Sequence, residues 1–284
     1  MLGIVLLGLS VSALWLLVEY VPRAQMPPSR MSITLLVAVL PALLGVSCLF
    51  RQGYGSPLLV SGLLGLLLLS FLPVLNRQPV TWLRLVYVLV PVLGVPAALG
   101  IIPGTERAPL YGPLTVNWVK GMLAVTLLLL FAAQVRGAWL YAGKRAGWRS
   151  WVLIPLLVIA VLLLGWRAGY GYDFKLSELT LAFLYGNLLF TVVAEEVLFR
   201  GLLQTGLMGW LKSYTPHYVV MAILLVSVLF GLAHLGGGWK YALLATVAGV
   251  VYGVSYHVTG KLSGAVLAHI GVNAGHFVFL QYEW

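Results

Sequence analysis

The stretch FTVVAEEVLFRGLL, residues 190–203, places two glutamates and an arginine inside an otherwise apolar run. The chain of 284 residues contains only seven acidic residues, and two of them, Glu195 and Glu196, stand side by side here. A carboxylate at the centre of a bilayer costs about 2.5–3.5 kcal/mol on insertion scales. If this run crosses a membrane, the protein must either offset that cost or use the carboxylates.

The composition indicates that lipid surrounds most of the chain. Hydrophobic residues make up 61% of the sequence, charged residues make up 8%, and the mean hydropathy is +1.01. A soluble domain carries about 25% charged residues. The apolar runs have the length of membrane-spanning α-helices and lack the alternation of an outer-membrane barrel. We therefore predict an all-α fold, a polytopic transmembrane helical bundle.

The net charge of +10 does not indicate binding to nucleic acid. The 17 lysines and arginines are scattered singly between the apolar runs. This pattern is typical of topology signals and of contact with anionic lipid headgroups. We expect the lipid bilayer as a partner, no nucleic acid, and a multi-pass integral protein of a bacterial inner membrane.

Ten apolar segments are candidate membrane spans, and loops rich in Pro, Gly and Arg separate several of them. Pro91 and Pro96 kink or split the fourth segment, so we expect about eight to ten spans. The only acid inside a segment of the first 150 residues is Glu19, at a segment end. We therefore assign residues 1–150 to scaffold helices and residues 151–284 to a catalytic helical core. The ten segments are 2–19, 32–50, 58–75, 83–102, 118–141, 151–166, 177–198, 217–235, 240–258 and 262–281.

The acidic pair is treated as part of a helix. Residues four apart share a helix face, whereas adjacent residues diverge by about 100°. Glu196 is therefore expected to pair with Arg200, while Glu195 points elsewhere and has no local partner. This surplus carboxylate is available for chemistry. The alternative is structural: Arg200 bridges both acids and holds helices together.

Two further groups of polar residues lie in apolar segments. Phe230 and His234 are four residues apart, on one face of the segment 217–235. His269, Asn273 and His276 form one stripe along the last segment, and this stripe must face a polar interior. Simple turns between the segments leave His269 about 10 Å from His234 in depth, which a tilted helix must close.

Carboxylates, imidazoles and an amide in a low-dielectric pocket suggest activation of water. A glutamate, helped by His234, would take a proton from a water that attacks a peptide carbonyl. His269 and Asn273 would donate hydrogen bonds to the developing oxyanion. No Ser or Cys stands beside a histidine as a covalent nucleophile. A Zn²⁺ site of one Glu and two His is an alternative, but HExxH is absent.

The motifs EEVLFR, FGLAH and HIGVN resemble the signatures EExxxR, FxxxH and HxxxN of the CPBP (CAAX protease and bacteriocin-processing, or ABI) family of intramembrane proteases. Eukaryotic relatives in that family are the type II CAAX prenyl endopeptidases. The resemblance covers residues 177–281. It implies that Glu195 activates water with His234 as its partner, and that no cofactor is needed. It also implies that His269 and Asn273 form the oxyanion site.

The expected site therefore has two parts. The catalytic residues are Glu195, Glu196, His234, His269 and Asn273, and the supporting residues are Arg200, Phe230 and His276, the last of which lies outside the family pattern.

The expected reaction is hydrolysis of a peptide bond in a membrane-anchored protein or peptide. Processing of C-terminal sorting tails and maturation of peptides are the two roles that we consider. The alternatives are a metal-dependent form of the same protease, a non-catalytic immunity or scaffold protein of the membrane, and a transporter with a proton-relay glutamate.

Overall fold

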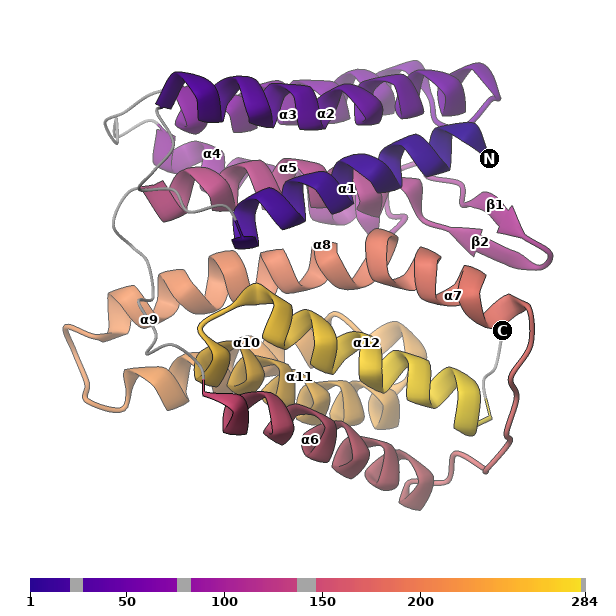
Figure 1. The fold of residues 1–284 in the computed structure, drawn as a ribbon, viewed down its shortest axis with the longest axis vertical. Coiled ribbons are helices and arrows are strands. Elements are labelled where there is room, and N and C mark those ends of the chain that lie inside the picture. The colour runs from indigo at the N-terminus through magenta and orange to yellow at the C-terminus, as the bar shows by residue number, and fades with distance from the viewer. Residues whose placement is uncertain (21–27, 76–82, 137–146, 282–284) are drawn as a thin grey trace. The chain divides into compact units, whose positions relative to one another are not determined.

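The computed structural model of the chain describes residues 1–20, 28–75, 83–136 and 147–281 (Figure 1). Over these residues the protein is an all-α helical bundle, as predicted. Six of the described helices are long and apolar enough to cross a membrane, and four shorter helices are also apolar. The protein is therefore a multi-pass integral membrane protein.

The helices follow the predicted segments, with few exceptions. The fourth segment is one helix that contains both Pro91 and Pro96 and is not split. The elements are α1 (Leu2–Tyr20), α2 (Pro28–Arg51), α3 (Pro57–Leu75), α4 (Leu83–Ala98), β1 (Ala108–Tyr111), β2 (Leu114–Val116), α5 (Trp118–Arg136), α6 (Trp148–Arg167), α7 (Leu179–Asn187), α8 (Val193–Glu196), α9 (Thr205–Leu211), α10 (Tyr218–Leu232), α11 (Trp239–Thr259) and α12 (Leu262–Phe279).

The chain forms two compact units, and each is described by itself. Unit 1 contains Met1–Leu140 and Tyr185–Val197, and unit 2 contains Tyr141–Leu184 and Leu198–Trp284. The segment that carries Glu195 thus belongs with the N-terminal helices by its contacts. The functional division at residue 150 stays a prediction.

The core of unit 1 is α5, which packs against α1, α3, α4 and α8. Its side chains from Trp118 to Ala132 are almost all buried. A helix that is apolar on every side belongs in the interior of a bundle, and α5 follows this rule except at Lys120. The strands β1 and β2 pair antiparallel and precede α5 in the chain. This hairpin lies between the predicted segments 83–102 and 118–141.

Unit 2 is built around α11, which packs against α6, α10 and α12. Small residues, among them Ala242, Gly249 and Gly253, let the neighbouring helices approach α11 closely. Gly238 precedes α11 as its N-cap residue with φ 91°, a backbone conformation that favours glycine, and so allows the short turn after α10.

The seventh predicted segment, 177–198, was predicted to end too early in the chain. The apolar helix continues from Leu179 to Leu211, a length of 33 residues. Two stretches of it are π-helical, Leu188–Val192 and Val197–Gln204, and the single α-helical turn α8 lies between them. Short π-helical stretches occur frequently at functional sites. The turn between these two stretches carries Glu195 and Glu196.

Candidate active site

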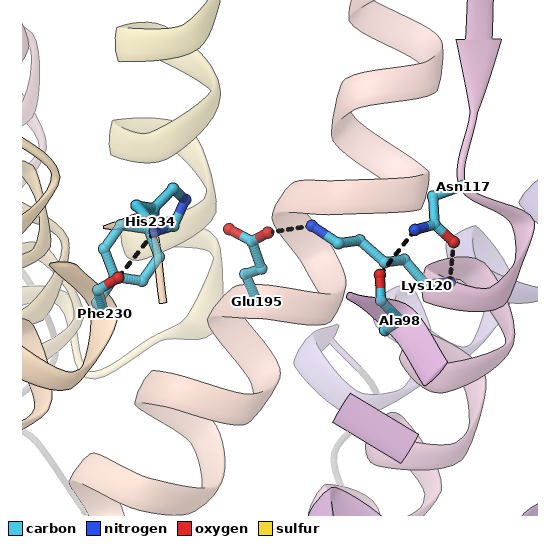
Figure 2. A network of polar contacts seen from close by, with 6 residues as sticks. All are labelled: Ala98, Asn117, Lys120, Glu195, Phe230 and His234. Carbon is cyan, nitrogen blue, oxygen red and sulfur yellow. Dashed lines mark hydrogen bonds and ion pairs between the residues drawn. The ribbon is translucent and has the colours of Figure 1, made fainter. Parts of the chain in front are cut away.

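Glu195 forms an ion pair with a lysine of the N-terminal helices. The Oε1 atom of Glu195 lies 2.6 Å from Nζ of Lys120, and their side chains are 13% and 21% exposed (Figure 2). Both residues belong to unit 1, where α5 packs against α8. The sequence predicts no partner for Glu195 on its own helix, and the partner seen here is not local, because Lys120 lies 75 residues earlier in the chain.

The position of Lys120 is set by the beginning of α5. The side chain of Asn117 accepts a hydrogen bond of 3.1 Å from the backbone N–H of Lys120. This is an N-cap interaction, which satisfies one of the free N–H groups of the first helical turn. The Nδ2 atom of Asn117 donates to the carbonyl oxygen of Ala98 at 2.7 Å, which ties this cap to the end of α4 (Figure 2).

Glu196 is completely buried, with 0% of the residue exposed. It ends the α-helical turn that precedes the second π-helical stretch. The predicted pairing of Glu196 with Arg200 assumed a regular α-helix between them. Because Val197–Gln204 is π-helical, the i, i+4 spacing does not by itself place the two side chains on one face. Their pairing stays a prediction.

Arg200 is fully buried in unit 2, among aromatic rings. Its Nη2 atom donates a hydrogen bond of 3.0 Å to the carbonyl oxygen of Gly249. The guanidinium carbon lies 5.2 Å from the ring centre of Phe230 and 5.7 Å from that of Tyr252. Guanidinium groups bind well to aromatic faces in a desolvated setting. Arg200 thus fixes its own helix to α11 and supports the ring of Phe230.

His234 lies just after α10 rather than within it, because the helix ends at Leu232. It keeps the expected relation to Phe230: the His234 Nδ1 atom is 2.7 Å from the Phe230 carbonyl oxygen, and the two rings are 4.5 Å apart (Figure 2). The hydrogen bond to the backbone fixes the orientation of the imidazole, and the Nε2 atom is the ring nitrogen left for a substrate or water.

His269 is buried, with 3% exposed, and its ring also contacts Phe230 at a centroid distance of 5.6 Å. The phenyl ring of Phe230 therefore touches both imidazoles. A ring between two imidazoles was not anticipated.

Tyr252 is a member of this cluster that the sequence analysis missed. Its ring stacks on His269 at 4.4 Å, with an angle of 13° between the planes, and meets Phe230 edge to face at 5.8 Å. One signal was present in the sequence: glycines stand at positions 249 and 253, near Tyr252 in an apolar helix, and leave room for neighbouring side chains.

The remaining two residues of the α12 stripe lie further along the helix. Asn273 is half-buried. The ring of His276, two turns beyond His269, meets Tyr170 edge to face at 5.1 Å. Tyr170 belongs to the segment after α6, and that segment is bound to the C-terminal residues through backbone hydrogen bonds such as Asp173 to Phe279. His276 thus contacts the segment after α6, whereas His269 contacts Phe230 and Tyr252.

Among the described residues, no three His, Cys, Asp or Glu side chains gather as a metal site. The metal-dependent alternative therefore has no ligand set among these residues. The cofactor prediction remains untested by this.

The comparisons with known proteins agree with the sequence motifs. Residues 177–275 match the family model of type II CAAX prenyl endopeptidases, Rce1-like. The match spans about a third of the chain and includes all three motifs. It confirms the resemblance to the CPBP family over these residues, and this family is one of peptidases. A search of curated proteins and a search of solved structures each gave no match.

Proposed function

We propose that this chain, recognised through residues 177–275 as a CAAX-type membrane peptidase, hydrolyses a peptide bond with water activated by Glu195. The observation that carries the proposal is the match itself, because Glu195, His234, His269 and Asn273 all lie within it. The burial of His269, and of Glu196 and Arg200 beside Glu195 in the same motif, in a multi-pass membrane protein supports it. Ionisable residues in such helices are expensive and serve function by default.

The proposed reaction needs only side chains and water. The Glu195 carboxylate takes a proton from water while the water oxygen attacks the scissile carbonyl carbon. His269 and Asn273 donate hydrogen bonds to the oxyanion that forms. The tetrahedral intermediate then expels the amine, which takes up the proton held by the glutamate, and the C–N bond breaks.

In this scheme His234 assists Glu195, with its ring oriented by the Phe230 carbonyl. Glu196 and Arg200 do not touch the substrate in this scheme and act through neighbouring residues. Arg200 holds the Phe230 ring and the α11 backbone, so its contribution is to keep the imidazoles in place.

The proposed substrate is a membrane-anchored protein or peptide, and the bond cleaved lies near a hydrophobic C-terminal sorting tail. The support for this is indirect. The N-terminal helices offer apolar surface in addition to the matched third of the chain, and exposed leucines and valines line α1 and α2. In a bilayer such surface contacts lipid or another transmembrane helix.

A proteolysis assay tests the function. The purified protein in detergent is incubated with a candidate tail protein, with and without a chelator. We compare the wild type with Glu195→Ala and with the matched control Glu106→Ala, an exposed acid of unit 1. The expected result is cleavage by the wild type and the control, with or without chelator, and none by Glu195→Ala.

Other results would redirect the proposal. Loss of cleavage on chelation favours the metal-dependent protease. Full function of Glu195→Gln in cells favours a non-catalytic immunity or scaffold protein. In a strain that carries Glu195→Ala, an uncleaved membrane-anchored precursor should accumulate. Unchanged substrate sizes across the membrane proteome would contradict the sorting-tail role.

A further inference from the structure

We infer that Lys120, a residue of the N-terminal helices, is a positioning residue for the reaction: its ion pair holds the Glu195 carboxylate in one orientation. The inference rests on the proposed function of Glu195 as the base. It assigns a part of the machinery to a segment that lies outside residues 177–275, where neither the motifs nor the family match place any.

The geometry is that of a strong, directional ion pair. The Nζ–Oε1 distance of 2.6 Å is at the short end of the range for charge-assisted hydrogen bonds. Both side chains are mostly buried, at 21% and 13% exposed, so water screens their interaction little. The backbone of Lys120 is fixed by the Asn117 cap, and Asn117 is fixed in turn by Ala98. The start of α5, which carries the Lys120 ammonium group, is therefore held in place by these two hydrogen bonds.

The chemistry of a general base explains why orientation matters. A general base must lie within hydrogen-bond reach of the proton that it takes from water, so its geometry comes first. A catalytic side chain keeps one productive geometry only when neighbouring groups lock its rotamer. The ion pair with Lys120 does this for the Glu195 carboxylate.

A purely structural role accounts poorly for the pair. Helix α5 packs against α8, and both carry buried apolar side chains, such as Met122 and Val193, which are buried without any charge. A buried ion pair is weak evidence for stability, because the desolvation of two charges offsets their attraction. Two apolar residues would hold these helices together equally well. The pair is explained by what it does to the carboxylate.

The first test measures the contact in the wild-type protein. A hydrophobic carbodiimide activates a carboxyl group, and an amine in contact with it then forms an amide with the loss of one water. We expect an isopeptide cross-link between Lys120 and Glu195, found by mass spectrometry of the digested membrane protein. The variant Lys120→Arg should give none. Absence of this cross-link in the wild type, with other carboxyl groups modified, overturns the inference.

The second test measures the effect on the reaction. For Lys120→Met we expect kcat to fall by about 10–100-fold with little change in KM, because the Glu195 carboxylate is no longer held in one orientation. Lys120→Arg keeps a cation at this position and should retain most of the wild-type kcat. Lys212→Met, which removes an exposed lysine of unit 2, is the matched control.

The outcomes separate this inference from the proposed function. If wild type and Lys212→Met cleave the substrate and Lys120→Met shows the wild-type kcat, Lys120 has no positioning role. If the wild type does not cleave any tail, the proposed function fails, while the cross-link still reports on the ion pair. Lys120→Gln provides a second neutral variant if Lys120→Met is not recovered as a folded protein, and the same loss of kcat is required of it.

Discussion

Replacement of Gly231 by alanine should push α10 and α11 apart. Gly231 lies on α10, and a Cβ atom there would be 2.6 Å from the carbonyl oxygen of Ala242 and would overlap Oγ1 of Thr246. The Thr246 hydroxyl donates a hydrogen bond of 2.9 Å to the same Ala242 oxygen, so it would have to rotate away from its acceptor. The backbone oxygen cannot rotate away, and the helices themselves must therefore move.

The size of the effect follows from three terms. Overpacking of a well-packed site costs about 1–3 kcal/mol. The displaced Thr246 hydrogen bond, which lies within α11, adds about 0.5–1.5 kcal/mol. The better helix propensity of alanine returns about 0.5–1 kcal/mol. We therefore expect a net loss of about 0.5–4 kcal/mol, which corresponds to a fall of roughly 1–16 °C in Tm.

The assay is thermal unfolding in detergent, followed by tryptophan fluorescence. The matched control is Gly206→Ala on α9, where a Cβ meets nothing within 4 Å. That variant should unfold at the wild-type temperature or slightly above it. Cleavage activity should also fall in Gly231→Ala, because Gly231 lies between Phe230 and His234. A Gly231→Ala protein with wild-type Tm would refute the reasoning from close helix approach.

Three further variants test other contacts. Arg200→Lys keeps the charge but loses the planar group on the rings and the bond to Gly249, so we expect a loss of about 1.5–3 kcal/mol, measured by thermal unfolding. Asn117→Ala removes the α5 cap and should cost about 1 kcal/mol and lower the yield of the Lys120–Glu195 cross-link. Tyr252→Phe keeps the stack on His269 and should leave kcat close to wild type, whereas Tyr252→Leu should lower kcat.

Each of these variants has its own contrary result. Arg200→Lys with unchanged Tm would mean that the guanidinium contacts contribute nothing. An undiminished cross-link in Asn117→Ala would show that Lys120 does not depend on the cap. Equal activity of Tyr252→Phe and Tyr252→Leu would remove the aromatic stack from the reasoning about His269.

The helical fold could be predicted from the sequence because hydropathy decides it. The segments 2–19 and 262–281 match α1 and α12 within a few residues. The predicted segment that bears the glutamates ends at residue 198. In the structure polar residues beyond that end bond to helix α11: Arg200 donates to Gly249 and Gln204 donates to Gly253. A hydropathy pattern does not show which groups on another helix a polar side chain will bind. The end of the helix at Leu211 was therefore not predicted.

The residues of the candidate site could likewise be predicted only in part. The motif residues could be found from the sequence, since buried ionisable groups are conspicuous in an apolar chain. Lys120 and Tyr252 were missed. A single lysine near a helix end is typical of headgroup contact, and a single tyrosine is typical of an interfacial position. Only their distances to Glu195 and His269 distinguish them from such residues.

The distance in sequence between Lys120 and Glu195 affects how the protein is made. At a synthesis rate of about 5–20 residues per second, the 75 residues that separate them take roughly 4–15 seconds. During that interval the newly made α5 carries an ammonium group whose counter-ion, Glu195, has not yet been synthesised. Assembly of unit 1 therefore has to wait for a segment from the second half of the chain.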